Sequence, residues 1–528
     1  QGRLGGLCGP PAPLPAPTRP PPAPPATMAS IAVLSLAGRR LLGPEPLSGP
    51  VPVAELRQRA RVAAGCGRRE LRLVLGSEEL EDGQLLGGEE GPAGLLELTA
   101  VLVSRSCRVV TWGSRNFGGC SDAVAEQLSS GVVSVFRSDN AFAALKDRGA
   151  VVSWGPPECQ IGIDAVVEQL GSGVAAVCCS DFAFAALKES GAVVTWGDAA
   201  CGGDSSAVAE RLSHGVAEVY ATERAFAAVG RGGTVITWGN AAYGGDGGSI
   251  REQLSSGVTT ISSTARAFAA LKESGAVVCW GDRVYGADVG IAAKNVGSGV
   301  CRLYHTSRAF AAAKERGAIV TWGQADCGGV SRAVSDQLSH GITAVYSNSR
   351  CFAALTEAGA VITWGTPLLG GDCSAVAAEL SHGVVAVFST AQAFAALKDA
   401  GAVVTWGAAA GGGDCCRVAD RLAADVTTVC GTAAAFAALK TGGEVVAWGN
   451  EDCGGDTRHV AAELSGGVAS LHCTTTAFAA LKDMGAVVTW GFRSDGGNSD
   501  AVRAQLAVGV VGLSSTRYAF AALREVES

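Results

Sequence analysis

The chain has 528 residues, of which 48% are hydrophobic and only 17% are charged. This composition favours folded structure over disorder, and the length predicts more than one domain. The formal net charge of −8 speaks against a general nucleic-acid binder, although it leaves a local basic patch open. The 73 glycines in an otherwise apolar chain indicate many tight turns.

Two further absences narrow the class of protein. No run of 18 apolar residues occurs, so we expect no transmembrane helix and no membrane partner. The 18 cysteines contain no pair of Cys-x-x-Cys motifs, which speaks against a zinc ribbon. We interpret most cysteines as small apolar side chains in a reducing compartment, cytoplasmic or nuclear, with a disulfide-bonded extracellular protein as the alternative.

Residues 1–27 are rich in proline and lack the apolar run of a signal peptide. They predict a disordered tail with polyproline II character, and the alternative is a proline-rich ligand for another domain. Met28 is a candidate initiator, in which case the tail would not belong to the native protein.

Residues 28–104 have the pattern of a β-grasp domain. Three apolar runs, at 31–36, 70–75 and 94–102, predict strands. Between the first two, Val53, Leu56 and Ala60 lie three and four residues apart, which predicts a short helix.

The segments 72–75 and 79–85 of this domain resemble the third strand of ubiquitin and the turn after it. The domain departs from conjugated ubiquitin-type modifiers in two ways. The last strand continues into the next domain instead of ending in a free Gly-Gly, and Lys146 is the first lysine of the chain, so the resemblance implies an integral ubiquitin-like domain and not a conjugated tag. Glu97 and Thr99 stand near where ubiquitin has its apolar recognition patch, which weakens that patch.

Ten tryptophans divide residues 105–528 into ten units of 42 residues. They are Trp112, Trp154, Trp196, Trp238, Trp280, Trp322, Trp364, Trp406, Trp448 and Trp490. A strict period without insertions indicates one supersecondary unit per copy, stacked on its neighbours. We expect all ten tryptophans to be structural.

Within one copy, residues 216–220, 225–229 and 234–238 predict three strands, the last two joined as a hairpin. The preceding copy shows a short helical stretch at 207–212 that a glycine, Gly215, ends. This glycine recurs in nine of the ten copies, and Asp425 replaces it in the other.

The motif Phe-Ala-Ala-Leu-Lys-x-x-Gly-Ala-Val-Val-Thr-Trp-Gly resembles the repeat of the regulator of chromosome condensation superfamily, and also that of propeller-shaped β-lactamase inhibitors. The resemblance covers residues 107–526 and implies a β-propeller with about one repeat per blade. Seven blades are that family's number, whereas this chain has ten repeats. The predicted fold is therefore mainly β, with a propeller-like ring and a short helix per repeat, and an open superhelical solenoid is the alternative.

The ends of the array favour closure. The first unit starts with the tryptophan strand at 108–112 and lacks its phenylalanine strand, which the last unit supplies at 518–524. Pairing the two would complete one blade and remove two exposed sheet edges.

Three polar repeat positions are candidate sites. Six copies carry an aspartate after Gly-Gly or a related pair: Asp204, Asp246, Asp288, Asp372, Asp414 and Asp456. We interpret them as turn and cap residues, because one carboxylate per repeat is too few for calcium. His214, His340 and His382 suit a helix C-terminus, and seven lysines suit a solvated hairpin turn: Lys146, Lys188, Lys272, Lys314, Lys398, Lys440 and Lys482. We expect no metal site and no cofactor.

No catalytic motif is found, and a repeated scaffold favours binding over catalysis. We therefore expect a non-enzymatic scaffold, in which the ubiquitin-like domain recruits, with a ubiquitin-pathway receptor as a possible partner, and the array holds a protein. A carbohydrate-binding propeller is one alternative. A regulator of a small GTPase, which the superfamily resemblance implies, is the other.

The best candidate for a binding surface is a row of arginines fourteen residues before the tryptophan in four successive copies: Arg224, Arg266, Arg308 and Arg350. The position lies in a loop, so the four should form a basic stripe on one rim. Arginine forks suit carboxylates and phosphates, which implies an acidic or phosphorylated protein partner. The alternative is that each arginine pairs with an acidic neighbour or covers a sheet edge.

Overall fold

The computed structural model of the protein describes residues 107–526 and the backbone of seven strands between residues 30 and 103. The chain divides into two compact units, residues 1–104 and 105–528. The predicted tail at 1–27 and the predicted helix at 53–60 lie outside the described residues. In the part of the chain that is described, no helix is long and apolar enough to cross a bilayer.

The first unit contains a mixed sheet. Its strands are β1 (Ser30–Ser35), β2 (Arg40–Pro46), β4 (Glu70–Leu75), β5 (Glu78–Glu79) and β7 (Leu95–Val103), in the order β2-β1-β7-β4-β5. The first strand, β1, runs parallel to the last, β7, and antiparallel to β2. A separate pair joins β3 (Val51–Pro52) to β6 (Leu85–Leu86).

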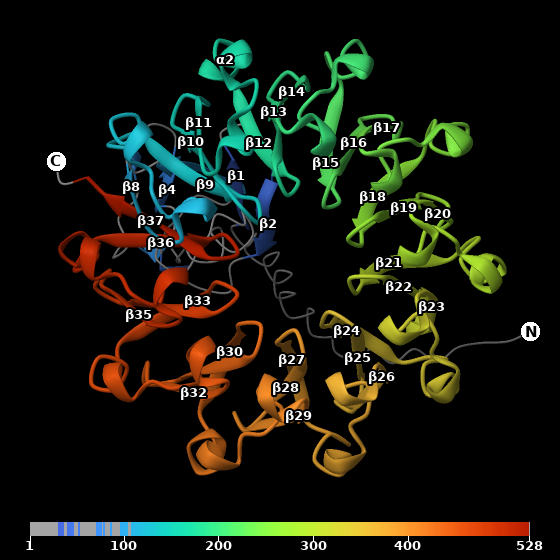
Figure 1. The fold of residues 1–528 in the computed structure, drawn as a ribbon, viewed down its shortest axis with the longest axis vertical. Helices are drawn as coiled ribbons and strands as arrows, with labels where there is room; N and C mark the ends of the chain where they lie inside the picture. Colours follow the sequence, from blue (N-terminus) through green and yellow to red (C-terminus); the bar gives the residue numbers. More distant parts are fainter. Residues whose placement is uncertain are drawn as a thin grey trace, which may run out of the picture. The chain divides into compact units, whose positions relative to one another are not determined.

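The second unit is a ring of ten three-stranded antiparallel blades, which Figure 1 shows arranged around a central opening. Successive strands of a blade lie progressively further from the opening. The prediction of a mainly β chain with a propeller-like ring is confirmed. Each blade consists of an inner, a middle and an outer strand, in sequence order.

The inner strands are β9 (Val132–Arg137), β12 (Val174–Cys179), β15 (Val216–Ala221), β18 (Val258–Ser263), β21 (Val300–His305), β24 (Ile342–Ser347), β27 (Val384–Ser389), β30 (Val426–Gly431), β33 (Val468–Cys473) and β36 (Val510–Ser515). The middle strands are β10 (Phe142–Lys146), β13 (Ala183–Lys188), β16 (Ala225–Gly230), β19 (Ala267–Lys272), β22 (Ala309–Lys314), β25 (Cys351–Thr356), β28 (Ala393–Lys398), β31 (Ala435–Lys440), β34 (Ala477–Lys482) and β37 (Ala519–Glu525). The outer strands are β11 (Val151–Trp154), β14 (Val193–Gly197), β17 (Val235–Gly239), β20 (Val277–Gly281), β23 (Ile319–Gly323), β26 (Val361–Gly365), β29 (Val403–Gly407), β32 (Val445–Gly449), β35 (Val487–Gly491) and β8 (Cys107–Gly113).

The ring closes through a composite blade. The outer strand β8, from the start of the array, pairs with the last strand, β37, so that Trp112 lies opposite Phe520 and Gly113 opposite Ala519. Each inner strand contacts the next, and β36 contacts β9. The array is therefore a closed ring, and the alternative of an open solenoid is wrong for this chain.

A second set of bonds links neighbouring blades at the residue fifteen positions before each tryptophan. At eight of the ten junctions this residue donates its backbone N–H to the carbonyl of the equivalent residue in the next blade, at 2.8–3.2 Å. At the other two junctions a side chain donates instead: Asn140 Nδ2 to Asp181 O at 2.9 Å, and Ser349 Oγ to Ala391 O at 2.6 Å. One of the eight backbone bonds, from Arg517 N to Asp139 O at 2.9 Å, links the last repeat to the first.

The core lies between blades. Alanines of the middle strands are fully buried and let neighbouring sheets approach, while each blade stacks its phenylalanine on its tryptophan with ring centroids 5.0–5.4 Å apart. All ten tryptophans are at most 4% exposed. In nine blades the indole N–H donates to a glycine carbonyl of the preceding repeat at 2.9–3.0 Å.

That acceptor must be glycine for a steric reason. Gly244, which accepts from Trp280, has φ of +93°, and a Cβ there would lie 2.7 Å from the Phe268 ring. The exception is Trp196, whose preceding repeat has Gln160 at this position. The indole nitrogen of Trp196 and the amide nitrogen of Gln160 are both buried without a hydrogen-bond partner.

The predicted helix of each repeat takes 3₁₀ form in almost every copy, because the stretch is too short to complete α-helical turns. The segment 206–208 is typical, and α2 (Ile163–Val166) is the one α-helix within residues 107–526. The glycine that ends the stretch has positive φ, as in Gly215 at +77°. Asp425, which replaces it once, adopts the same left-handed conformation at +66°.

The unpaired indole supplies a first prediction. Replacing Trp322 with phenylalanine removes its bond to Gly286 O, whereas the same change at Trp196 removes no bond. Both changes lose similar ring area. Trp322→Phe should therefore lower the free energy of unfolding by about 1 kcal/mol more than Trp196→Phe, measured by chemical denaturation. Equal losses in the two variants would show that the indole bond does not stabilise the ring.

The closure of the ring supplies a second prediction. Deleting residues 518–528 removes β37 and leaves both β8 and β36 without their partner. Exposed strand edges pair with other chains, so this variant should unfold more easily and elute as larger species in size exclusion with light scattering. Deleting residues 526–528, which follow β37, is the control and should leave a monodisperse chain. A stable, monodisperse 518–528 deletion would contradict closure by strand pairing.

Candidate functional site

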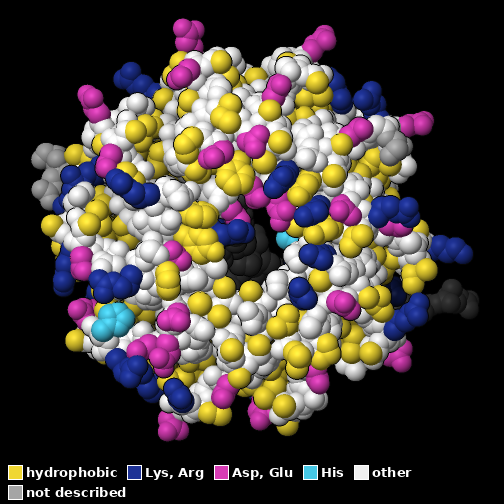
Figure 2. All heavy atoms as spheres, in the orientation of Figure 1, with side chains coloured by type: hydrophobic (Ala, Val, Ile, Leu, Met, Phe, Trp, Pro, Cys, Tyr) yellow, Lys and Arg dark blue, Asp and Glu magenta, His cyan; other side chains and the backbone are white. Residues whose placement is uncertain are grey.

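The four predicted arginines lie on one face of the ring. Each follows an inner strand and precedes a middle strand, in the loop that faces the end of the outer strand, as the pairing of Ala225 with Gly239 shows. We call the edge formed by these loops in all blades the loop face. In Figure 2 basic side chains follow one another along part of the rim of the central opening.

Three of the arginines alternate with two tyrosines from the loops after the outer strands. The Cζ of Arg224 lies 5.4 Å and that of Arg266 4.8 Å from the ring centroid of Tyr243. On the next tyrosine, Tyr285, Arg266 and Arg308 each lie at 4.8 Å. We call this set, Arg224, Tyr243, Arg266, Tyr285 and Arg308, the arginine–tyrosine row. Arg350 occupies the same loop position in the following blade.

Cation–π contacts fix the guanidinium planes while leaving N–H groups at their edges for other acceptors. Within residues 107–526, none of the four arginines forms an ion pair with a carboxylate. Arg308 donates one hydrogen bond, from Nη1 to Gln324 Oε1 at 3.2 Å. Arg224 and Arg350 are exposed, and Arg266 and Arg308 are half-buried. The row is therefore an ordered cationic surface that forms no ion pair within residues 107–526.

An acidic arc adjoins the row at the mouth of the central opening. Asp139, Asp181 and Glu223 occupy one loop position in three successive blades, immediately before Arg224 in the last of them. They border a cavity of about 460 Å³ that Arg137 and His305 also line. Asp139 is paired with Arg517 at 2.9 Å. We call Asp139, Asp181 and Glu223 the acidic arc.

Burial and the neighbouring carboxylates of the acidic arc change the pKa of one of its members. The pKa of Asp181 is raised from 3.8 to about 6, first by burial and then by the carboxylates of Asp139 and Glu223. The guanidinium groups of Arg517 and Arg224 oppose this shift without cancelling it. The loop face thus has a sign change between Glu223 and Arg224, which are neighbours in sequence.

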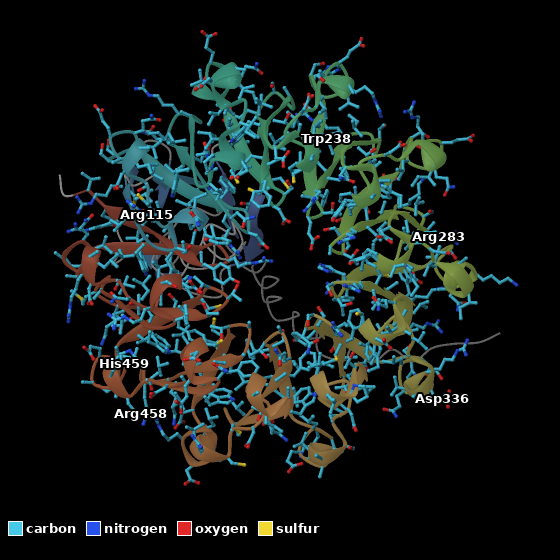
Figure 3. The ribbon with its side chains drawn as sticks, in the orientation of Figure 1. Arg115, Trp238, Arg283, Asp336, Arg458 and His459 are labelled. Carbon is cyan, nitrogen blue, oxygen red and sulfur yellow. The ribbon has the colours of Figure 1, made fainter. Side chains whose placement is uncertain are left out.

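Two further ion pairs of the ring lie at its periphery. Arg283 pairs with Asp288 at 2.5 Å and Arg458 with Asp456 at 2.7 Å. Figure 3 shows Arg283 and Arg458 at the periphery, in the segments that follow the outer strands. Both arginine side chains are exposed. Exposed surface pairs of this kind contribute little to stability.

The six repeated aspartates each accept a backbone N–H two residues on, at 2.8–2.9 Å, which is a turn contact. The side-chain hydrogen bonds from Arg458, and after them its backbone N–H, lower the pKa of Asp456 to about 2. No cluster of three or more metal-binding side chains occurs among the described residues. His214, His340 and His382 each share a hydrogen bond of 2.8–3.0 Å with the preceding serine hydroxyl.

The seven repeated lysines are more than solvated turn residues. Each donates from Nζ to the backbone carbonyl nineteen residues earlier, at 2.6–2.9 Å, and so fastens the 3₁₀ segment to the hairpin turn. The sequence interpretation missed this contact because the acceptor is a backbone atom of a distant segment. The ten tryptophans are buried, so none offers an exposed indole face for a sugar ring.

Sequence reasoning also missed the two tyrosines and the acidic arc. Both have a recognisable signal, since Tyr243 and Tyr285 share one repeat position, and the arc occupies the position next to the arginines. What the sequence does not reveal is that the loop after one outer strand reaches the arginine of the following blade.

Comparison with known proteins identifies no relative by sequence, since no family model and no curated protein matches the chain. Solved structures similar to it include Prp20p from Saccharomyces cerevisiae, described for its binding to Gsp1p and histones, at 13% identity over 50% of this chain and 82% of that chain, with a TM-score of 0.30. A structure of Kap60 bound to yeast RCC1 (Prp20) matches at 12% identity over 80% and 90%, with a TM-score of 0.33. Human WBSCR16 matches at 14% identity over 80% and 100%, with a TM-score of 0.31. At these values the assignment of a ten-bladed β-propeller rests on the strand pairing of this chain alone.

The acidic arc yields a third prediction. Because Asp181 has a higher pKa in the folded chain than in the unfolded one, the folded state holds its proton more tightly, and stability falls as pH rises from about 4 to 6. Asp181→Asn removes this penalty and should raise the free energy of unfolding at pH 7 by about 1 kcal/mol, after allowance for partial exposure, with no gain at pH 4.

The matched control is Asp204→Asn. The pKa of Asp204 is lowered by its hydrogen bonds, so its contribution is present at neutral pH and lost as pH falls. The two variants should therefore show opposite pH trends in denaturation midpoints. A loss of stability at pH 7 in Asp181→Asn would contradict the assignment of an uncompensated carboxylate.

Proposed function

We propose that the chain is a non-enzymatic protein-binding scaffold, and that the loop face of the ring holds an acidic or phosphorylated segment of a protein partner. The observation that carries the proposal is the arginine–tyrosine row. Three guanidinium groups from consecutive blades are stacked on tyrosines and form no ion pair within residues 107–526. Elsewhere the repeated charged positions have internal partners, since the aspartates accept turn N–H groups and the lysines bind carbonyls.

Pre-organisation makes such a row suited to binding. An arginine that is free in solution loses side-chain entropy when it binds a partner, and stacking against a ring removes part of that loss beforehand. The N–H edges that remain match carboxylates and phosphates in a two-pronged geometry. A repeated charge that is ordered and unneutralised therefore favours recognition of an anionic group over a purely structural role.

The first unit supports a recruiting role in the same proposal. Its strand order, with the first and last strands parallel and side by side in the sheet, is the one expected of a β-grasp domain. Together with the ubiquitin-like segments at 72–75 and 79–85, this order supports an integral ubiquitin-like domain that binds a receptor of the ubiquitin pathway. A cytoplasmic or nuclear location suits such a receptor and the unpaired thiols of Cys178 and Cys179.

The buried tryptophans count against the carbohydrate alternative, and no feature of the loop face favours regulation of a small GTPase over other protein binding. The scaffold is therefore the function that the geometry supports best.

The test is charge reversal in the full chain. Arg266→Glu with Arg308→Glu should abolish most of the partner capture from cell extract that wild-type protein shows, by quantitative mass spectrometry. Residual capture should fall more steeply with salt, because the contacts are ionic. Circular dichroism and thermal unfolding should match those of the wild type.

The control is Arg148→Glu with Arg231→Glu, which makes the same change of net charge on exposed hairpin turns at the opposite edge of the blades. It should leave capture intact. If both double variants capture the same partners as the wild type, the loop face is not the binding surface. If the row variant unfolds, the arginines are structural, and the proposal is dropped.

A further inference from the structure

The spacing of the arginine–tyrosine row limits what it can bind, provided that the proposed function is right. Arg266 and Arg308 both lie over the ring of Tyr285, each with Cζ 4.8 Å from its centroid. Their charges are therefore no more than twice 4.8 Å apart. Arg224 and Arg266 both lie over the ring of Tyr243, at 5.4 and 4.8 Å. The row thus presents one cation per blade, and neighbouring cations are no more than about 10 Å apart.

An extended chain fits within this limit. An extended segment advances about 3.4 Å per residue and directs every second side chain to the same face, so anionic groups two residues apart are about 6.8 Å apart and face the same side. Four adjacent acidic residues would place half of their charges on the far side of such a segment. We infer that the arginine–tyrosine row binds an extended segment of a partner protein whose carboxylate or phosphate groups occur at every second residue.

The curvature of the ring favours an extended segment over a helix. Arg224, Arg266, Arg308 and Arg350 come from four consecutive blades of a ten-bladed ring, so the four arginines span about three tenths of a turn. A straight helix of about 10 Å diameter meets such an arc at one or two blades only. An extended chain bends at each residue and follows it.

The acidic arc sets one end of the binding segment. A segment that continues past Arg224 along the rim meets Glu223 and then Asp181 and Asp139, where burial, and after it the neighbouring carboxylates, already raises the pKa of Asp181 to about 6. Further anionic groups would be repelled there. The segment therefore carries its acidic groups only over the four arginine blades. A long polyanion such as single-stranded nucleic acid is disfavoured for the same reason, since its phosphates continue without interruption.

The experiment uses fluorescence anisotropy to compare the affinities of two peptides of equal composition for the full chain. One alternates four glutamates with four serines, and its isomer places the four glutamates together. The alternating peptide should bind at least about tenfold more tightly, since all four of its carboxylates face one side. A phosphoserine version of the alternating peptide distinguishes phosphate from carboxylate as the preferred group. An oligothymidylate of eight nucleotides is the nucleic-acid probe and should bind more weakly than either alternating peptide.

Two variants of one tyrosine test whether the row acts as a spaced platform. Tyr285→Phe keeps the ring under both arginines and should preserve the preference for the alternating isomer. Tyr285→Ala frees Arg308 and leaves Arg266 on Tyr243 alone, without changing any charge, and should reduce the preference to about twofold or less. Loss of the preference in both variants, or retention in both, would contradict the inference.

The two proposals fail differently. If capture of partners depends on Arg266 and Arg308 while the two peptide isomers bind equally, the loop face is a binding surface but the spacing inference is wrong. If the oligothymidylate binds more tightly than the alternating peptides, the row is a nucleic-acid surface, and the inference is again wrong. If neither capture nor peptide binding responds to charge reversal, the proposed function itself fails.

Discussion

The contact between the tryptophan of one repeat and the glycine turn of the preceding repeat is the constraint on which the ring depends. It joins a buried indole N–H to a carbonyl in the neighbouring blade, and it requires a residue without a side chain, because the phenylalanine ring lies against it. The bond runs across a blade boundary, so the tryptophan holds blades together as well as filling them. Nine boundaries use it, including the one that joins the end of the array to its beginning.

A ring built from one repeated contact leaves little of its core free for anything else. The aspartates, lysines, phenylalanines and tryptophans at repeated positions all have structural partners. Under the proposed function, specificity lies where the repeats differ, and the loop face is one place where they differ in charge. The change of sign on the loop face falls between Glu223 and Arg224, where the acidic arc of three blades meets the arginine row.

Much of this could be predicted from the sequence. The 42-residue period fixed the number of blades, and the divided first and last units predicted the composite blade that pairs β8 with β37. The arginine row could be identified from the sequence as one repeat position, because the strict 42-residue period places equivalent residues at equal spacing. The stacking of Arg266 between Tyr243 and Tyr285 was not visible, since it depends on how far one blade turns relative to the next. The raised pKa of Asp181 likewise depends on burial at the mouth of the opening.

Hydrogen–deuterium exchange of the full chain, with and without the alternating acidic peptide, tests most directly whether the loop face is the binding surface. The account predicts that protection appears in the loops at 222–225, 264–267 and 306–309, and that the hairpin turns on the opposite edge exchange as before. Protection confined to those hairpin turns, or to the blades outside the arginine row, would contradict it.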